Sequence, residues 1–147
     1  MIIVHAPSRR DVKGTRFILK AVNELRSEGY NFEFRLVEKV SRDKALKLIK
    51  EADVVIDQLI IGWYGMVTIE AMSAGKPVIC YISQDLLEKY KPPIIPADKH
   101  TIKRTLKDVL DRKYNLKEIG IKAREYYNKV HSPRKVCDRW CRIYSSI

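Results

Sequence analysis

Two loops in the sequence contain residues that suit a phosphate-bearing ligand. The first is PSRRDVKGT, residues 7–15, in which Arg9, Arg10 and Lys13 precede a helical pattern. Gly14 stands where that helix begins, and a helix N-terminus adds free N–H groups and a favourable dipole to the cationic side chains. The loop matches neither a Walker loop nor a Gly-x-Gly-x-x-Gly fingerprint, so it does not indicate a P-loop NTPase or an NAD dehydrogenase. Solvated surface charges are the alternative interpretation of this loop.

The second loop is GWYGMVTIE, residues 62–70, which leads into a short apolar helix. Gly65 allows the backbone to approach a ligand closely, and the N–H groups of Met66 and Val67 lie where the helix begins. Glu70 follows one turn later, where an ionised carboxylate needs hydrogen-bond partners. Its two acceptor oxygens suit paired hydroxyls, such as those of a ribose. A structural Glu70 that caps a loop or pairs with an arginine is the alternative.

The elements that must position these loops alternate between short apolar runs and helical patterns, which is typical of a parallel α/β sheet. Strands are predicted over residues 1–5, 31–37, 53–57, 78–82 and 94–95. Helices are predicted over residues 15–28, 42–51, 67–74, 101–110, 116–130 and 132–145, and residues 6–13 are predicted to be a polar loop. Ligands bind at the carboxyl ends of strands in such sheets, and both loops follow a predicted strand.

The charge of the chain is its one unusual compositional feature. The 147 residues include 29 Lys and Arg against 18 Asp and Glu, a formal charge of +11. The hydrophobic fraction of 46% excludes a disordered or collagen-like chain, and the length fits one domain. Residues 1–98 are net +2 and residues 99–147 are net +9. This excess favours an anionic partner, which is phosphate, a membrane or nucleic acid.

Cysteine usage and targeting signals point to the cytoplasm. Three cysteines without paired spacing, Cys80, Cys137 and Cys141, predict free thiols in a reducing compartment. The N-terminus places apolar residues before basic ones, the reverse of a signal peptide, and no apolar run is long enough to span a bilayer.

No metal ion or cofactor is predicted either. The sequence has no Asp-x-Asp motif, and its three histidines lack metal-ligand spacing. Cys137 and Cys141 lie four residues apart with no further ligand nearby, and His5 is expected to be structural.

Three segments resemble the C-terminal domain of retaining glycosyltransferases with the GT-B fold, family four. GMVTIEAMSAGKPVI, residues 65–79, resembles the family signature, and RRDVKGT, residues 9–15, resembles its phosphate-binding segment. EIGIKAREYYNKVHSPRKV, residues 118–136, is similar to the closing helices of such domains. The resemblance extends over nearly the whole chain. It implies a Rossmann-like, doubly wound parallel sheet with helices on both faces, which is one half of a GT-B fold.

The resemblance also implies a nucleotide-sugar donor, linked to UDP or GDP, and metal-independent hexosyl transfer. Lys13 and one of Arg9 or Arg10, beside Gly14, would bind the diphosphate and stabilise it as it leaves. Gly65, Met66 and Val67 would meet phosphate or sugar through backbone groups, and Glu70 would hold the ribose. The base would lie past the second strand, at residues 38–40, near Val40.

One position departs from the family pattern. The family usually has a second glutamate eight positions before Glu70, whereas this chain has Gly62 within GWYG. The sequence around Gly62 resembles a distinct subgroup. It does not decide which of residues 62–64 would contact the donor sugar.

A GT-B enzyme places its active site between two domains, and this chain has room for one. We therefore expect a single domain over residues 1–147, onto which the helices of residues 99–147 pack with Tyr126, Tyr127, Trp140 and Tyr144. The N-terminal acceptor domain would be absent or supplied by a partner chain. Alone, the chain is expected to bind nucleotide and transfer no sugar.

A non-catalytic basic binding module for an anionic membrane or nucleic acid is the alternative function. Nucleic acid is disfavoured, because the basic residues lack a recognition motif and few aromatic residues interleave with them in the body. Residues 99–147 could rest on anionic lipid, with each basic side chain contributing about 1 kcal/mol, which would make the protein peripheral at a membrane. The spread of the lysines over several helix faces favours solubility over a membrane-inserting stripe.

Overall fold

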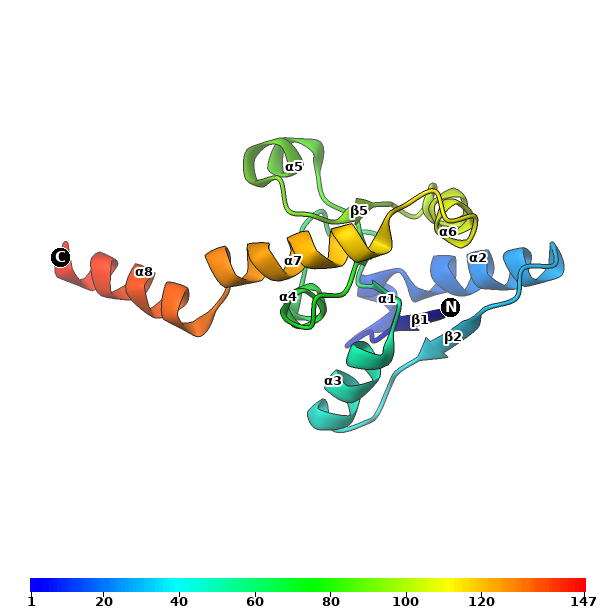
Figure 1. Ribbon diagram of the computed structural model, residues 1–147, viewed down its shortest axis with the longest axis horizontal. Coiled ribbons are helices and arrows are strands. Elements are labelled where there is room, and N and C mark those ends of the chain that lie inside the picture. Colours follow the sequence, from blue (N-terminus) through cyan, green and yellow to red (C-terminus); the bar gives the residue numbers. More distant parts are fainter.

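The computed structural model describes residues 1–147 and contains a five-stranded parallel sheet (Figure 1). Its strands are β1 (Ile2–His5), β2 (Glu33–Leu36), β3 (Val54–Ile56), β4 (Val78–Cys80) and β5 (Ile95–Pro96). Its helices are α1 (Arg10–Lys13), α2 (Thr15–Ser27), α3 (Arg42–Glu51), α4 (Met66–Ser73), α5 (Gln84–Tyr90), α6 (Ile102–Leu110), α7 (Leu116–Val130) and α8 (Pro133–Ser145). The strand order is β2-β1-β3-β4-β5, and every pairing is parallel.

Both faces of the sheet are covered, because successive strand residues point to opposite sides. Ile3 of β1 belongs to a core cluster that includes buried residues of α2 and α6. Its neighbour Val4 belongs to a second cluster, to which α3 contributes Ile49 and α4 contributes Ala71. Strands buried on both faces have continuous apolar sequence, which is why MIIVH has no polar alternation. The predicted Rossmann-like, doubly wound α/β fold is confirmed.

Two helices were missing from the sequence prediction. The segment predicted as a polar loop over residues 6–13 contains α1, a single turn that ends at Gly14 in the left-handed conformation with φ 74°. Helix α5 was also not predicted, and none of its residues is fully buried. A helix of one turn or one without a buried stripe leaves no apolar periodicity to detect. No helix in the chain combines the length and apolarity that crossing a membrane requires.

The C-terminal helices differ from one another in how they pack. Helix α6 buries Leu106 and Val109. Helix α7 buries Ala123 and contacts α4, and its Gly120 packs against Gly75 just after α4 ends. Helix α8 has no buried residue and extends away from the sheet (Figure 1). The expectation that all helices of residues 99–147 pack on the body is therefore wrong for α8. Its aromatic residues Trp140 and Tyr144 are exposed, because an apolar stripe has the same spacing whether or not a partner covers it.

His5, at the carboxyl end of β1, connects three elements in the core. Its Nδ1 lies 2.9 Å from the carbonyl oxygen of Ile56, and its Nε2 lies 2.9 Å from the hydroxyl of Thr15. A carbonyl only accepts, so Nδ1 holds the proton and Nε2 accepts from Thr15. Burial lowers the pKa of His5 to about 4. His5 is thus a neutral structural residue, as expected.

The buried neutral His5 should make the protein less stable in mild acid. The unfolded chain takes up a proton near pH 6.5 whereas the folded chain does so only near pH 4. The stabilisation is therefore complete above about pH 6.5 and is lost as the pH falls toward 4. Urea unfolding should show a loss of about 2 kcal/mol between pH 7 and pH 5.

Substitution separates this effect from other titrations. His5→Asn, which keeps a donor for the Ile56 carbonyl, should flatten the pH dependence, while His100→Asn at an exposed position should leave it unchanged. A small slope should persist, because burial also lowers the pKa of His131. Equal slopes for His5→Asn and the parent chain would contradict the assignment.

Candidate functional site

The strand order locates the candidate site at the carboxyl edge of the sheet between β1 and β3. From β1 the chain runs outward to β2 on one side and to β3, β4 and β5 on the other. Such a reversal separates the loops after the two central strands and creates a crevice for ligands. The loops that follow β1 and β3 are the two that the sequence singled out.

A buried ion pair joins these two loops at the reversal point. The ammonium of Lys13 lies 2.7 Å from the carboxylate of Asp57, and the two residues are 8% and 1% exposed. The other oxygen of Asp57 accepts from the N–H of Gly65 and from the hydroxyl of Thr68, each at 2.7 Å. Asp57 thereby fixes α1, the end of β3 and the start of α4 to one another.

Gly65 is required by the closeness of this pair. A Cβ at position 65 would stand 2.7 Å from the Lys13 ammonium and 3.4 Å from an oxygen of Asp57. Any larger residue would therefore displace a buried charge, which is costly because the pair would be separated. In the structure the group closest to this position is the side chain of Lys13, and the predicted approach of a ligand to the backbone of Gly65 stays a prediction.

The loop between β3 and α4 is organised by Gln58, which is fully buried. Its amide oxygen accepts from the N–H groups of Ile60 and Ile61 at 2.8 and 2.6 Å. Its amide nitrogen donates to the carbonyl oxygens of Trp63 and Tyr81 at 2.8 and 2.6 Å. One side chain therefore sets the shape of the Gly62–Gly65 region, because every polar atom of it is bonded to loop backbone.

A cavity of about 300 Å³ opens at this edge between three loops. Its wall combines the loop after β1, the loop after β2 and the first turns of α4, and includes Ser8, Glu38, Val40, Val67 and Glu70. Three residues predicted for the site, Val40, Val67 and Glu70, thus lie around one space although they are distant in sequence. The mixed apolar and polar wall is of the kind that holds small organic ligands.

The two arginines of the first loop are exposed and paired with acids. Arg10 donates two parallel hydrogen bonds, at 2.7 and 2.6 Å, to Glu38, which lines the cavity. This contact lowers the pKa of Glu38, since Arg10 stabilises its ionised form. Arg9 pairs with Asp11 at 2.7 Å. Exposed pairs of this type are weak, so a phosphate can replace the carboxylate partners at little cost.

Glu70 lines the cavity and has one cationic neighbour. Its carboxylate lies 3.3 Å from the guanidinium of Arg42 on α3, and its side chain is 19% exposed. The arginine partner that the sequence allowed is thus present. Because one exposed guanidinium occupies only part of a carboxylate with two oxygens, Glu70 retains acceptor capacity toward the cavity.

The remaining predicted residues lie outside the cavity wall. Met66 is 61% exposed at the start of α4, and its N–H has no partner within the helix. Gly14 packs against Leu59 and Ile60 with its left-handed backbone.

Sequence reasoning missed Asp57 and Gln58 as organising residues. The available signal was a polar pair placed directly between a buried strand and a glycine-containing loop.

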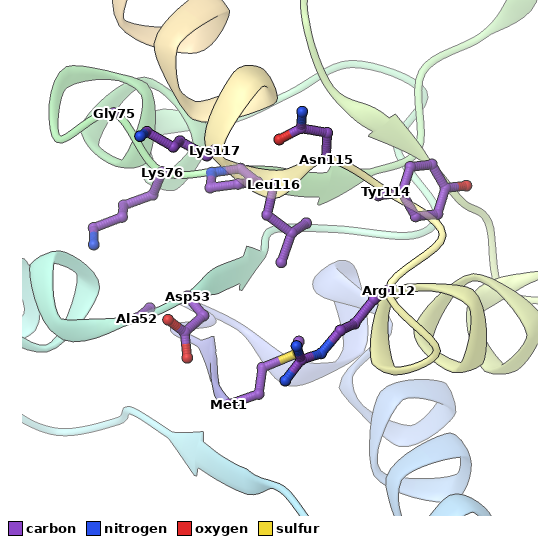
Figure 2. Close-up of a pocket in the computed structure, with 11 residues that line it drawn as sticks. Met1, Ala52, Asp53, Gly75, Lys76, Arg112, Tyr114, Asn115, Leu116 and Lys117 are labelled. Carbon is purple, nitrogen blue, oxygen red and sulfur yellow. The ribbon is translucent and has the colours of Figure 1, made fainter.

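The largest cavity, of about 580 Å³, lies at the opposite edge of the sheet. Figure 2 shows it between the start of β1, the turn after α4 and the segment before α7, with Met1, Lys76 and Arg112 among its labelled residues. Asp53 in its wall accepts from the N–H of Ile2 at 2.6 Å, and this hydrogen bond joins the residue before β3 to the first residue of β1. Ligands of parallel sheets bind at carboxyl ends, so the smaller cavity is the better candidate.

Loss of the Lys13 ammonium should destabilise the fold strongly. Lys13→Met would leave the buried Asp57 carboxylate without a cation, at a cost of about 3–5 kcal/mol in the free energy of unfolding. Urea unfolding at neutral pH should show this loss, and adding Asp57→Asn should recover part of it. Lys20→Met, at an exposed position on α2, should change stability by no more than about 0.5 kcal/mol. Equal stability of the two lysine variants would show that the pair does not hold the loops.

Comparison with known proteins supports the fold assignment. Thirty-six chains of solved structures match, among them WaaG, a glycosyltransferase involved in lipopolysaccharide biosynthesis, with a TM-score of 0.60 and 16% sequence identity. The match covers 88% of this chain and 43% of the WaaG chain, so this chain spans less than half the length of that enzyme. Neither a protein-family model nor a curated protein matches the sequence. The similarity shows that this Rossmann-like domain has the fold of part of a glycosyltransferase.

Proposed function

We propose that the chain is the nucleotide-sugar-binding domain of a retaining, metal-independent glycosyltransferase of GT-B family four. The observation that supports this most is the cavity in which Glu70, Val40 and the start of α4 meet. The glycosyltransferase fold of the neighbour adds support, as does the signature-like sequence of residues 65–79.

In this proposal each part of a nucleoside diphosphate has its own place in or beside the cavity. The base would lie against the loop after β2, near Val40, where an apolar side chain lines the wall. The ribose would place its two hydroxyls on the Glu70 carboxylate, which only accepts when ionised. The diphosphate would then extend toward Ser8 and the first N–H groups of α4, at Met66 and Val67, where the helix dipole favours negative charge.

The cationic side chains of the first loop would stabilise the departing diphosphate. Arg9 and Arg10 would exchange their partners Asp11 and Glu38 for phosphate oxygens as charge develops. The resemblance implied that the Lys13 charge is paired with the diphosphate, whereas in the structure this charge is already balanced by Asp57. An ammonium has three donors, so Lys13 can still donate toward the diphosphate while Asp57 holds it in place.

Sugar transfer would require a second domain or a partner chain that binds the acceptor. The isolated chain is expected to bind a UDP- or GDP-sugar without transferring it, because the sugar side of the site would face the missing partner. Turnover of either donor by this chain alone would contradict the two-domain proposal.

Removal of the Glu70 carboxylate should abolish discrimination between ribose and deoxyribose. By calorimetry the parent chain should bind UDP, or GDP, about tenfold more tightly than the 2′-deoxy analogue, since hydrogen bonds to charged groups contribute about 1.5–3 kcal/mol. In Glu70→Ala the two nucleotides should bind equally and weakly. Glu125→Ala, an exposed acid on α7, should retain the preference.

Two results would overturn the proposal. One is the absence of heat on titration with either nucleotide diphosphate at millimolar concentration while the chain is folded. The other is a preference for the ribonucleotide that persists in Glu70→Ala, which would mean that another group binds the ribose.

A further inference from the structure

The cavity at the opposite edge of the sheet from the candidate site is lined mainly by positive charge. Its volume of about 580 Å³ lies in the range of small-molecule sites. Three cationic side chains line it, those of Lys76, Arg112 and Lys117, and the only acid in its wall is Asp53. This excess of positive charge does not depend on the amino group of Met1, which also lines the cavity.

The three cations of this cavity have no acidic partners. None of them forms an ion pair within the chain. The basic residues at the carboxyl edge differ, because Arg10 and Lys13 each have a carboxylate partner. Unpaired cations around a concave wall concentrate positive potential inside it. A small anion that enters this cavity would therefore find free cations and would displace no acid.

The start of α7 adds a backbone donor to the same wall, which includes Asn115, Leu116 and Lys117. The N–H of Leu116 donates to the carbonyl oxygen of Tyr114 at 3.1 Å, and the N–H of Glu118 donates to the side chain of Asn115 at 3.1 Å. The N–H of Lys117 has no acceptor in the chain. A phosphate oxygen can accept from this N–H, and the dipole of the 15-residue helix favours its negative charge.

Figure 2 shows how these groups surround the space. Lys76 and Lys117 lie on one side of it and Arg112 on the other. The side chain of Leu116 projects between them. Asp53 uses one carboxylate oxygen to accept from the first N–H of β1 at 2.6 Å, so its other oxygen can accept from a hydroxyl. The wall thus combines donors for a phosphate, an acceptor for hydroxyls and an apolar side chain.

Two classes of anionic ligand can be compared by shape. A nucleic acid backbone is bound by cations spread along an extended surface, whereas these three surround one concavity. A small phosphate ester would fit inside it, with its phosphate on the cations and its hydroxyls on Asp53. The acceptor-binding domain that the proposed function requires would face the carboxyl edge of the sheet. It would therefore leave this cavity open.

We propose that the cavity binds a sugar phosphate and is a second ligand site, separate from the nucleotide site. The phosphate lies at the start of α7 between Lys76 and Lys117, and Arg112 faces it from the other side. The hydroxyls lie toward Asp53 and the carbon skeleton against Leu116. The site is formed by the turn after α4 and the start of α7 and uses none of the loops after β1 and β3, so it does not depend on the nucleotide proposal.

NMR titration of the ¹⁵N-labelled chain tests the proposal with glucose 6-phosphate, fructose 1,6-bisphosphate and glucose as probes. The two phosphates at millimolar concentration should shift the backbone amide signals of Lys76, Arg112 and Lys117. Glucose should shift none of them, because it has no charge to pair with the cations. The signals of Val40 and Val67, around the cavity proposed for the nucleotide, should stay unchanged with all three probes.

Arg112 allows its charge to be removed without loss of the fold. It follows α6 in the left-handed conformation, with φ 58°, where glycine is more favourable than arginine. Arg112→Gly should therefore raise the midpoint of thermal unfolding slightly, while it weakens the binding of glucose 6-phosphate about tenfold. Lys91→Gly is the matched control, because Lys91 ends α5 in the same conformation, with φ 45°, and does not line the cavity. This control should raise the midpoint likewise and leave binding unchanged.

Two pairs of lysines give a second comparison. Lys76→Gln/Lys117→Gln should abolish the binding of glucose 6-phosphate at millimolar concentration, because each lysine contributes a hydrogen bond from a charged group. Lys129→Gln/Lys135→Gln removes two exposed charges from α7 and α8, outside the cavity wall, and should leave binding nearly unchanged.

Any of four results would overturn the proposal. The first is the absence of shifts with either sugar phosphate while the chain is folded. The second is a set of shifts that persists in Lys76→Gln/Lys117→Gln or is centred on Val40 and Val67. The third is equal affinity for inorganic phosphate, which would mean an adventitious ion only. The fourth is tighter binding of duplex DNA than of the sugar phosphates, lost in the same lysine variant, which would assign these cations to nucleic acid.

Discussion

The buried ion pair between Lys13 and Asp57 is the constraint on which the candidate site depends. It joins the segment after β1 to the end of β3, and through Gly65 and Thr68 it also fixes the start of α4. Two charges withdrawn from water persist only when their geometry and their additional hydrogen bonds are satisfied. The pair therefore holds the loops in one arrangement, and the cavity beside them follows from that arrangement.

The charges of the molecule separate into two regions that differ in how far they are paired within the chain. At the carboxyl edge of the sheet three charges are balanced within the chain: Lys13 by Asp57, Arg10 by Glu38, and Glu70 in part by Arg42. An anionic ligand would be recognised there by exchange of exposed partners and by the N-terminus of α4. On α8, by contrast, the four cationic side chains form no ion pair within the chain.

Sequence patterns predicted the fold class because strands buried on both faces, such as β1 and β3, have continuous apolar sequence. They also located Val67 and Glu70 beside the cavity. They did not reveal the partner of Lys13, because Asp57 lies 44 residues away and nothing local relates the two. Helix α8 was misjudged for a related reason: the stripe that ends in Tyr144 has the spacing of a core-facing helix, and only the three-dimensional packing distinguishes the two cases.

The location of the nucleotide is the most direct test of the proposed function, because the candidate cavity and the largest cavity lie at opposite edges of the sheet. Backbone amide signals of the ¹⁵N-labelled chain, followed by NMR during titration with UDP or GDP, would decide between them. We predict shifts at Ser8, Val40 and Val67, around the cavity of about 300 Å³. Shifts confined to Lys76, Arg112 and Lys117, around the cavity of about 580 Å³, or no shifts at all, would contradict the proposed site.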